Sequence, residues 1–106
     1  MYNSSSGLHP ESIETATFEV SDDQVSCLLA GEAVILSLKS GVYYGLDAVG
    51  ARIWELCHQP KTVNEIREAL LAEFDVDPLL CERELIEFLA TLSSKELVQI
   101  GGLSNV

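Results

Sequence analysis

The sequence predicts a small α+β domain, in which a three-stranded antiparallel sheet is followed by three α-helices. Two observations predict this class. Up to Leu46, short apolar runs with alternating or β-branched residues are separated by glycine or acidic turns, which is typical of consecutive strands. After Asp47, apolar residues recur every three to four positions, which is typical of helices that lie on a core. With 106 residues, the chain has the length of one such domain.

The three predicted strands follow one another closely along the chain. They span residues 24–29, 33–39 and 42–46. The first has Val25, Cys27 and Leu29 on one face, and the period of the second indicates a buried face at Val34, Leu36 and Leu38. Between the second and third strands, Ser40-Gly41 predicts a two-residue hairpin turn, because glycine readily adopts positive φ.

Local end signals place the first two helices. Asp47 is a suitable N-cap for the first, which should stop near Pro60 because the residue before proline disfavours helix. Thr62 and Glu65 have the spacing of a capping box, with a hydroxyl at the N-cap and a carboxylate three residues later. We therefore expect the second helix to begin at this box.

The third helix should begin at Asp77-Pro78 and end near Ser93-Ser94. At about 100° per residue, its residues Cys81, Leu85, Phe88, Leu89 and Leu92 share one arc that would face the core. A second apolar group lies on one flank of this arc: Leu79, Ile86 and Ala90, bordered by Glu82 and Arg83. This flank either contacts another part of the chain or lines a groove.

Both ends of the chain lie outside this core pattern. Residues 1–16 are rich in serine and lack periodicity, so we expect a flexible tail, with the domain spanning residues 17–106. Residues 96–100 could form a short final strand. The N-terminus lacks the pattern of a signal peptide and no apolar run reaches membrane-spanning length, so a soluble, cytoplasmic protein is expected.

The formal net charge of −11 restricts the kinds of partner. An acidic chain is repelled by nucleic acid and by anionic membrane surfaces, so neither is expected as a partner. Acidity often serves solubility alone. The other interpretation of the negative charge is that the chain binds a neutral or basic peptide.

No catalytic or metal-binding arrangement is recognisable in the sequence. Cys27, Cys57 and Cys81 are far apart and lie in apolar patterns, so buried, reduced thiols are expected. The two histidines, His9 and His58, suggest no metal cluster or Cys-His pair, and the acidic pairs do not fit a calcium loop. We expect no cofactor, no metal and no enzymatic activity.

Several segments of the chain resemble the PqqD-like family in order and register. They are AVILSL, SGVYYGLDAVGARIWELC, TVNEI, EFDVD and ELIEFLATLSSKELV. The resemblance runs from about Gly31 to Ile100, which is about two-thirds of the chain, and leaves out the N-terminal 16 residues.

This resemblance implies a winged-helix-like domain that recognises the leader of a ribosomally made, post-translationally modified peptide (RiPP). The leader would add as a strand to residues 42–46 and pack beside the third helix. Expected peptide-binding residues are Val42, Tyr43, Tyr44, Gly45, Leu46, Leu79, Glu82, Arg83, Ile86 and Ala90. The implied partners are the precursor and its maturation enzymes. These are a leader peptidase and a cyclase in lasso-peptide pathways, the slightly favoured type, or a radical SAM enzyme in pyrroloquinoline-quinone pathways.

Two other functions are considered beside peptide binding. Three helices beside a small sheet also suggest a winged-helix DNA-binding regulator, but the third helix carries Glu82, Glu84 and Glu87 against Arg83 alone. It would approach phosphates with net negative charge. The second alternative is a structural subunit whose strand edge is occupied by its own tail or by a second copy.

Overall fold

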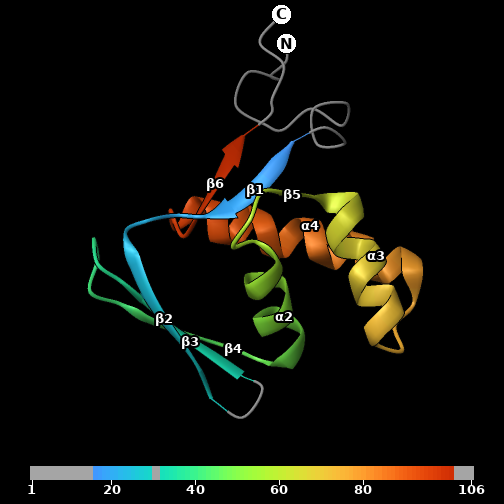
Figure 1. The fold of residues 1–106 in the computed structure, drawn as a ribbon, viewed down its shortest axis with the longest axis horizontal. Helices are drawn as coiled ribbons and strands as arrows, with labels where there is room; N and C mark the ends of the chain where they lie inside the picture. Colours follow the sequence, from blue (N-terminus) through green and yellow to red (C-terminus); the bar gives the residue numbers. More distant parts are fainter. Residues whose placement is uncertain (1–15, 30–31, 102–106) are drawn as a thin grey trace, which may run out of the picture.

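The computed structural model describes residues 16–29 and 32–101 (Figure 1). The predicted N-terminal tail therefore lies outside the described residues, except for Ala16, which is fully buried. In the part of the chain that is described, no helix is both long and apolar enough to cross a membrane.

The described part of the chain forms two three-stranded antiparallel sheets and three helices, which confirms the α+β class. In chain order the elements are β1 (Thr17–Val20), β2 (Gln24–Leu29), β3 (Glu32–Ser37), β4 (Tyr43–Leu46), α2 (Ala48–Leu56), β5 (Lys61–Thr62), α3 (Val63–Glu73), α4 (Pro78–Ser94) and β6 (Val98–Gly101). One sheet has the order β2–β3–β4, as the sequence predicts, and the other has the order β5–β1–β6.

The β5–β1–β6 sheet joins distant parts of the chain. Its central strand, β1, pairs with both neighbours, so that Phe18 lies opposite Lys61 on one side and Ile100 on the other. Figure 1 shows this sheet across one end of α4, next to both termini of the described chain. The sequence signalled only the beginning of an ordered segment at β1 and a strand near β6, which begins two residues later than expected.

The helix ends follow the predicted caps. The Asp47 carboxylate accepts from the Gly50 N–H at 2.9 Å at the start of α2. The capping box at Thr62 and Glu65 is present at the start of α3. At the start of α4, Asp77 accepts from two backbone N–H groups and is followed by proline at the first helical position. These caps satisfy N–H groups that a helix cannot satisfy internally.

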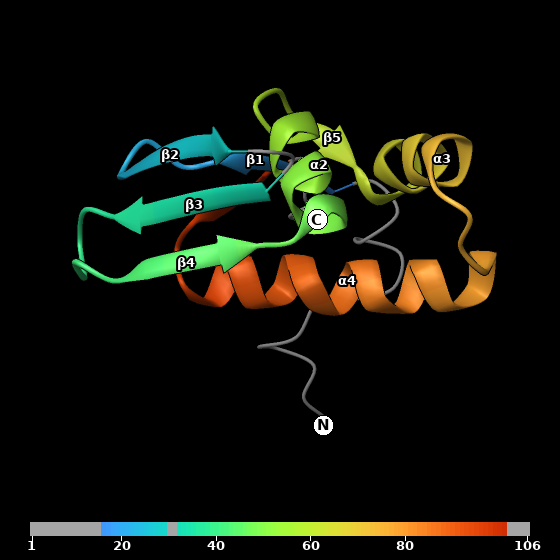
Figure 2. The same ribbon diagram turned by 90° about the horizontal axis from the view of Figure 1, so that it is seen from below.

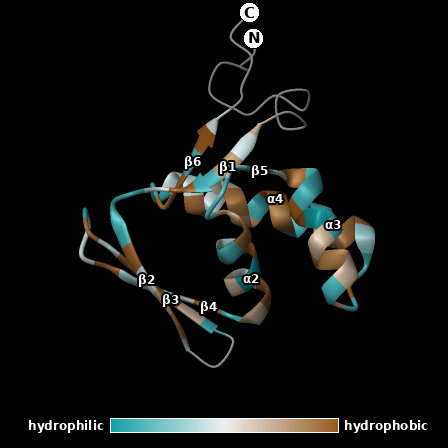
Figure 3. Cartoon of the chain, in the orientation of Figure 1, coloured by the Kyte–Doolittle hydropathy of each residue, from teal (hydrophilic) through white to brown (hydrophobic). Residues whose placement is uncertain are grey.

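The core lies between the two sheets and the three helices. Its largest fully buried side chains are Trp54, Phe18, Ile35, Ile66, Leu89, Leu97 and Cys57. Trp54 closes the core toward β2, where its indole N–H donates to the Ser26 hydroxyl at 3.1 Å. The alternating hydrophobic and hydrophilic bands of the helices in Figure 3 show the amphipathic faces that bury this core.

The prediction of the buried face of β3 was wrong. Ala33, Ile35 and Ser37 are buried, whereas Val34 is 37% exposed and Leu38 is 57% exposed. Both faces of this strand are apolar, so the alternation alone could not show which face α2 would cover. The same reversal exposes Val25 and Cys27 on β2, so Cys27 is not the buried thiol that was expected.

The turn before β4 also differs from the prediction. Five residues, 38–42, connect β3 to β4 in place of a two-residue turn. Gly41 adopts a φ of +73°, a conformation that favours glycine. The longer loop is held by the Gly41 N–H, which donates to the Ser37 carbonyl at 2.8 Å.

Candidate functional site

Strand β4 is an edge strand with one unpaired side. The Ser37 N–H of β3 donates to the Val42 carbonyl at 3.0 Å, and the register pairs Ile35 with Tyr44. In an antiparallel ladder the bonding direction alternates along the strand. The backbone N–H and C=O groups of Tyr43 and Gly45 are therefore directed away from β3, toward an edge that no described strand occupies. Such an edge is a template for a further strand.

The side chains of β4 alternate between two environments. Tyr44 and Leu46 are partly buried and pack against the core, whereas Tyr43 is 69% exposed on the other face. The Lys95 ammonium lies 5.3 Å from the centre of the Tyr44 ring, so a cation lies beside the first half of the strand. At Gly45 the space that a side chain would occupy is open.

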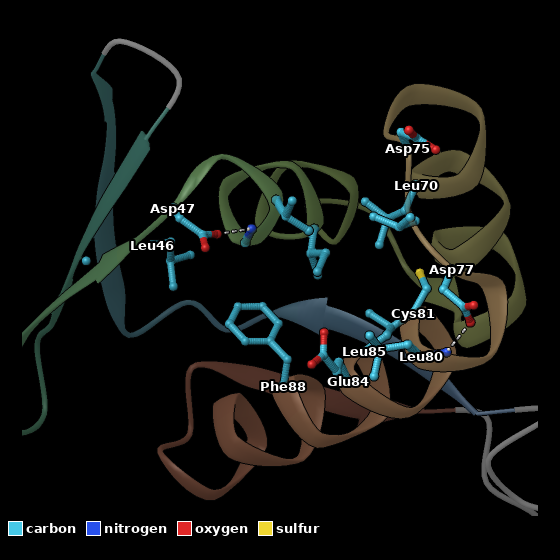
Figure 4. Close-up of a pocket in the computed structure, with 15 residues that line it drawn as sticks. Leu46, Asp47, Leu70, Asp75, Asp77, Leu80, Cys81, Glu84, Leu85 and Phe88 are labelled. Atoms are coloured by element: carbon cyan, nitrogen blue, oxygen red, sulfur yellow. Dashed lines mark hydrogen bonds between the residues drawn. The ribbon is translucent and has the colours of Figure 1, made fainter.

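A cavity of about 660 Å³ opens beside the end of β4. Figure 4 shows it between the first turn of α2 and the N-terminal half of α4, with the loop from α3 to α4 at the far end. Its apolar walls include Leu46, Val49, Ile53, Leu70, Leu80, Leu85 and Phe88. Gly50 allows the walls to approach, because a Cβ there would lie 3.3 Å from both Leu46 and Phe88.

Four carboxylates line the same cavity: Asp47, Asp75, Asp77 and Glu84. Asp47 and Asp77 already accept hydrogen bonds as helix caps. Asp75 and Glu84 form no ion pair or side-chain hydrogen bond with any described residue. In Figure 4 the Glu84 side chain extends from α4 toward the cavity. The site is thus apolar with an acidic lining at the end of β4 and a cation, Lys95, near Tyr44.

The structure separates the predicted site residues into two groups. The β4 residues lie along the free edge, and Gly45 and Leu46 line the cavity. None of the five predicted residues of α4 lines it. Leu79 is 84% exposed, and Arg83 lies beside it at a shallow hollow. Glu82 pairs with Arg67 of α3 at 3.6 Å. Ile86 packs against the core, and Ala90 is exposed.

The flank of α4 that faces β4 was not identified from the sequence. It carries Leu80, Cys81, Glu84 and Phe88. At about 100° per residue, this flank and the predicted one lie on opposite sides of the buried stripe through Leu85 and Leu92. The sequence places Phe88 and Cys81 on the apolar arc of this helix. This placement does not show which side of the arc meets the sheet.

The thiols of Cys57 and Cys81 lie in surroundings that disfavour the thiolate form. Burial raises the pKa of the Cys57 thiol to about 12 and also raises the pKa of Cys81, so neither thiol is activated as a nucleophile. Within residues 16–29 and 32–101, no three metal-ligating side chains gather in a group that could hold an ion. What the site provides is an open strand edge beside an apolar, acidic groove.

Comparison with known proteins adds an independent finding. The family model of the coenzyme PQQ synthesis protein D (PqqD) matches residues 32–98. The structure of TbiB1 in complex with the TbiA(β) leader peptide is 46% identical in sequence, with a TM-score of 0.71, over 76% of this chain and 94% of TbiB1. No curated protein matches the chain.

Two further solved structures share the fold at lower identity. One is a lasso peptide synthetase B1 complexed with the leader peptide, with 18% identity, a TM-score of 0.68, and coverage of 77% of this chain and 96% of that chain. The other is the PqqD part of Methylobacterium extorquens PqqCD, described as a stand-alone RiPP recognition element, with 20% identity, a TM-score of 0.64, and coverage of 78% and 88%.

Proposed function

The chain belongs to the PqqD family, and from this premise we propose that it binds the leader of a ribosomal precursor peptide on β4 and delivers the precursor to maturation enzymes. The observation that carries this proposal is the free edge of β4 beside the cavity. TbiB1, which is 46% identical, is a protein whose structure contains a bound leader peptide. In this proposal the chain itself performs no chemistry.

The β4 edge would supply affinity that depends little on the leader's sequence. A leader strand would form backbone hydrogen bonds with Tyr43 and Gly45, whose groups are directed outward. Alternate leader side chains would then point toward α4 and into the cavity, while the others would point to the opposite face of the sheet. The side chains directed toward α4 would provide selectivity.

The cavity suits a large apolar leader side chain next to a basic one. Burial of an apolar side chain among Leu46, Leu85 and Phe88 contributes about 1.5–3 kcal/mol. Glu84 and Asp75 would attract a basic leader residue nearby, and Lys95 would favour an acidic one near Tyr44. The pathway we favour is the lasso-peptide type, with a leader peptidase and a cyclase as partners, because a similar structure is a lasso peptide synthetase B1.

A second candidate follows from the family's description. A PQQ-type pathway would make the client a radical SAM enzyme that receives its precursor from this chain. If the chain serves a lasso-peptide pathway, it should bind the TbiA(β) leader more tightly than a PQQ precursor. If it serves a PQQ-type pathway, the order of the two affinities should be reversed. A competition between the TbiA(β) leader and a PQQ precursor would therefore separate them.

The proposal is tested by NMR titration of the labelled protein with the TbiA(β) leader peptide and with the leader encoded beside this chain's gene. We expect shifts at β4 and at the cavity. Leader binding should slow amide exchange at Tyr43 and Gly45 more than at Tyr44, because the Tyr44 N–H already faces β3. A peptide of the same composition in scrambled order is the control. Absence of binding by both leaders would refute the proposal, and salt-sensitive binding of duplex DNA would support a regulator instead.

A further inference from the structure

The face of the β2–β3–β4 sheet that points away from α2 is apolar and exposed. Two rows of directly opposite residues form it: Val25, Leu36 and Tyr43 in one row, and Cys27, Val34 and Gly45 in the other. We call these six residues the outer face. Val25 is 57% exposed, Val34 37% and Tyr43 69%. None of the six is charged, in a chain with a net charge of −11.

No described element covers the outer face. Figure 1 shows α2 on one side of this sheet, and Figure 2 shows α4 below β4, while the other side of the sheet carries neither helix. The buried side chains of these strands, such as Ile35 and Ala33, all belong to the inner face. A contiguous apolar patch on a sheet is a typical site of protein association.

The outer face is continuous with the proposed leader site. Tyr43 and Gly45 contribute backbone groups to the β4 edge and also belong to the two rows of the outer face. A leader strand on β4 would therefore extend both rows, with every second leader side chain on the same surface. Gly45 leaves open space at this margin, since a Cβ there would meet nothing within 4 Å.

We propose that the outer face is the docking surface for the enzyme that processes the leader-bound precursor. This inference rests on the proposed function and adds the surface that delivery requires. Two acidic residues stand at the ends of this face. Asp23 comes just before β2 and pairs with Lys39 at 3.7 Å, whereas Glu32, at the start of β3, forms no ion pair with a described residue. The complementary enzyme surface has an apolar centre and a basic margin.

A second copy of this chain is a poorer occupant of the outer face. Each copy carries a net charge of −11 and presents the same acidic margin, so two copies repel one another. An enzyme with a basic margin gains attraction where a second copy encounters repulsion. Because the bound leader would add its own side chains to the surface, the enzyme should bind the leader-loaded chain more tightly than the free chain.

The test measures binding of the leader peptidase encoded beside this chain's gene, by calorimetry, with and without the leader. Val34→Lys and Val25→Lys place a charge on the outer face at exposed positions that the core does not use. The matched control is Leu79→Lys, at an apolar residue that is 84% exposed on α4. A labelled leader is titrated into every variant separately.

We expect the leader to tighten enzyme binding by tenfold or more for the unmodified chain. The two outer-face variants should weaken enzyme binding by at least tenfold with leader affinity unchanged, whereas Leu79→Lys should change neither. Enzyme binding that is unaffected by both variants, or that is absent, overturns the inference. The inference is also overturned if sedimentation shows that the unmodified chain is a dimer and that Val34→Lys dissociates it, because a second copy of the chain would then occupy the outer face. If the unmodified chain fails to bind the leader, the proposed function is refuted. The role of the outer face is then decided by whether Val34→Lys and Val25→Lys weaken enzyme binding in the absence of leader.

Discussion

The two sheets of this domain have the same number of strands and different exposure. In the β5–β1–β6 sheet, Phe18 and Val98 are 2% and 3% exposed, and the edge strands have two and four residues. In the β2–β3–β4 sheet, Tyr43 and Val25 are 69% and 57% exposed, and the edge strand β4 ends beside the cavity. The first sheet places these apolar residues in the core, whereas the second leaves an apolar face exposed and an edge strand next to the cavity.

This difference separates stability from recognition. The β5–β1–β6 sheet ties the beginning of the described chain to its end and thereby closes the core. The β2–β3–β4 sheet needs only its inner face for that core, because Ile35 and Trp54 are buried there. The core does not use the β4 edge or the outer face of this sheet, so the partners proposed above would bind there without loss of core packing. The predictions below test this division, in order of expected effect.

The largest expected effect is loss of stability from Phe18→Ala. Removing this ring from a buried position should lower the free energy of unfolding by about 3–5 kcal/mol. Tyr43→Ala, on the exposed sheet, should change it by about 0.5 kcal/mol or less. Urea unfolding followed by circular dichroism measures both. Equal losses in the two variants would contradict the division between the sheets.

The next effect concerns which flank of α4 contacts the leader. Phe88→Ala should weaken leader binding by about 2 kcal/mol, which is roughly thirtyfold in Kd, because Phe88 forms a wall of the cavity beside β4. Leu79→Ala, on the flank predicted from the sequence, should leave the Kd unchanged. Calorimetric titration with the TbiA(β) leader measures both, after circular dichroism shows that each variant is folded. The reverse result would support the sequence-predicted flank.

A smaller effect is expected from the charge at the cavity. Glu84→Gln should weaken binding of a basic leader by roughly 0.5–1 kcal/mol and reduce the salt dependence of the Kd. Glu82→Gln is the matched control, because Glu82 pairs with Arg67 away from the cavity. Titrations at low and high salt distinguish them. Equal losses in both variants would indicate a general effect of net charge.

The smallest effect concerns the ion pair that links the two halves of the molecule. Lys39 in the loop before β4 donates to the Glu96 carboxylate at 2.6 Å, and this contact lowers the pKa of Glu96. The stabilisation is therefore present at neutral pH and is lost as the pH falls below the ordinary glutamate range toward the lowered pKa. Lys39→Met should flatten that acid-side loss in thermal melts. Unchanged pH dependence would show that the exposed pair contributes nothing.

The parts of the fold that could be predicted are those set by neighbouring residues. The caps at Asp47, Thr62 and Asp77 are correct because a capping side chain bonds to N–H groups two or three residues further along the chain. The β5–β1–β6 sheet could not be predicted as a unit. Its central pairings join Phe18 to Lys61 and Ile100, and four-residue strands carry too little periodicity to reveal distant partners.

The position of β4 could be predicted from the sequence, whereas the side of α4 that lines the cavity could not. The pattern around Tyr43 and Tyr44 predicted a strand, and β4 forms there at the edge of its sheet. Which side of α4 lines the cavity depends on the rotation of α4 about its axis, and this rotation brings Phe88 close to Gly50 of α2. A helix with apolar residues on both flanks of its core stripe does not show which flank meets the strand.

The open backbone at Tyr43 and Gly45 has an evolutionary consequence. Hydrogen bonds made by the main chain survive most changes of side chain, so the backbone part of the proposed contact tolerates sequence drift in either molecule. Selection for a new precursor would then act mainly on a few cavity positions of α4, such as Leu80, Glu84 and Phe88. Exchange of these residues between relatives should transfer preference for one leader to another while β4 stays unchanged.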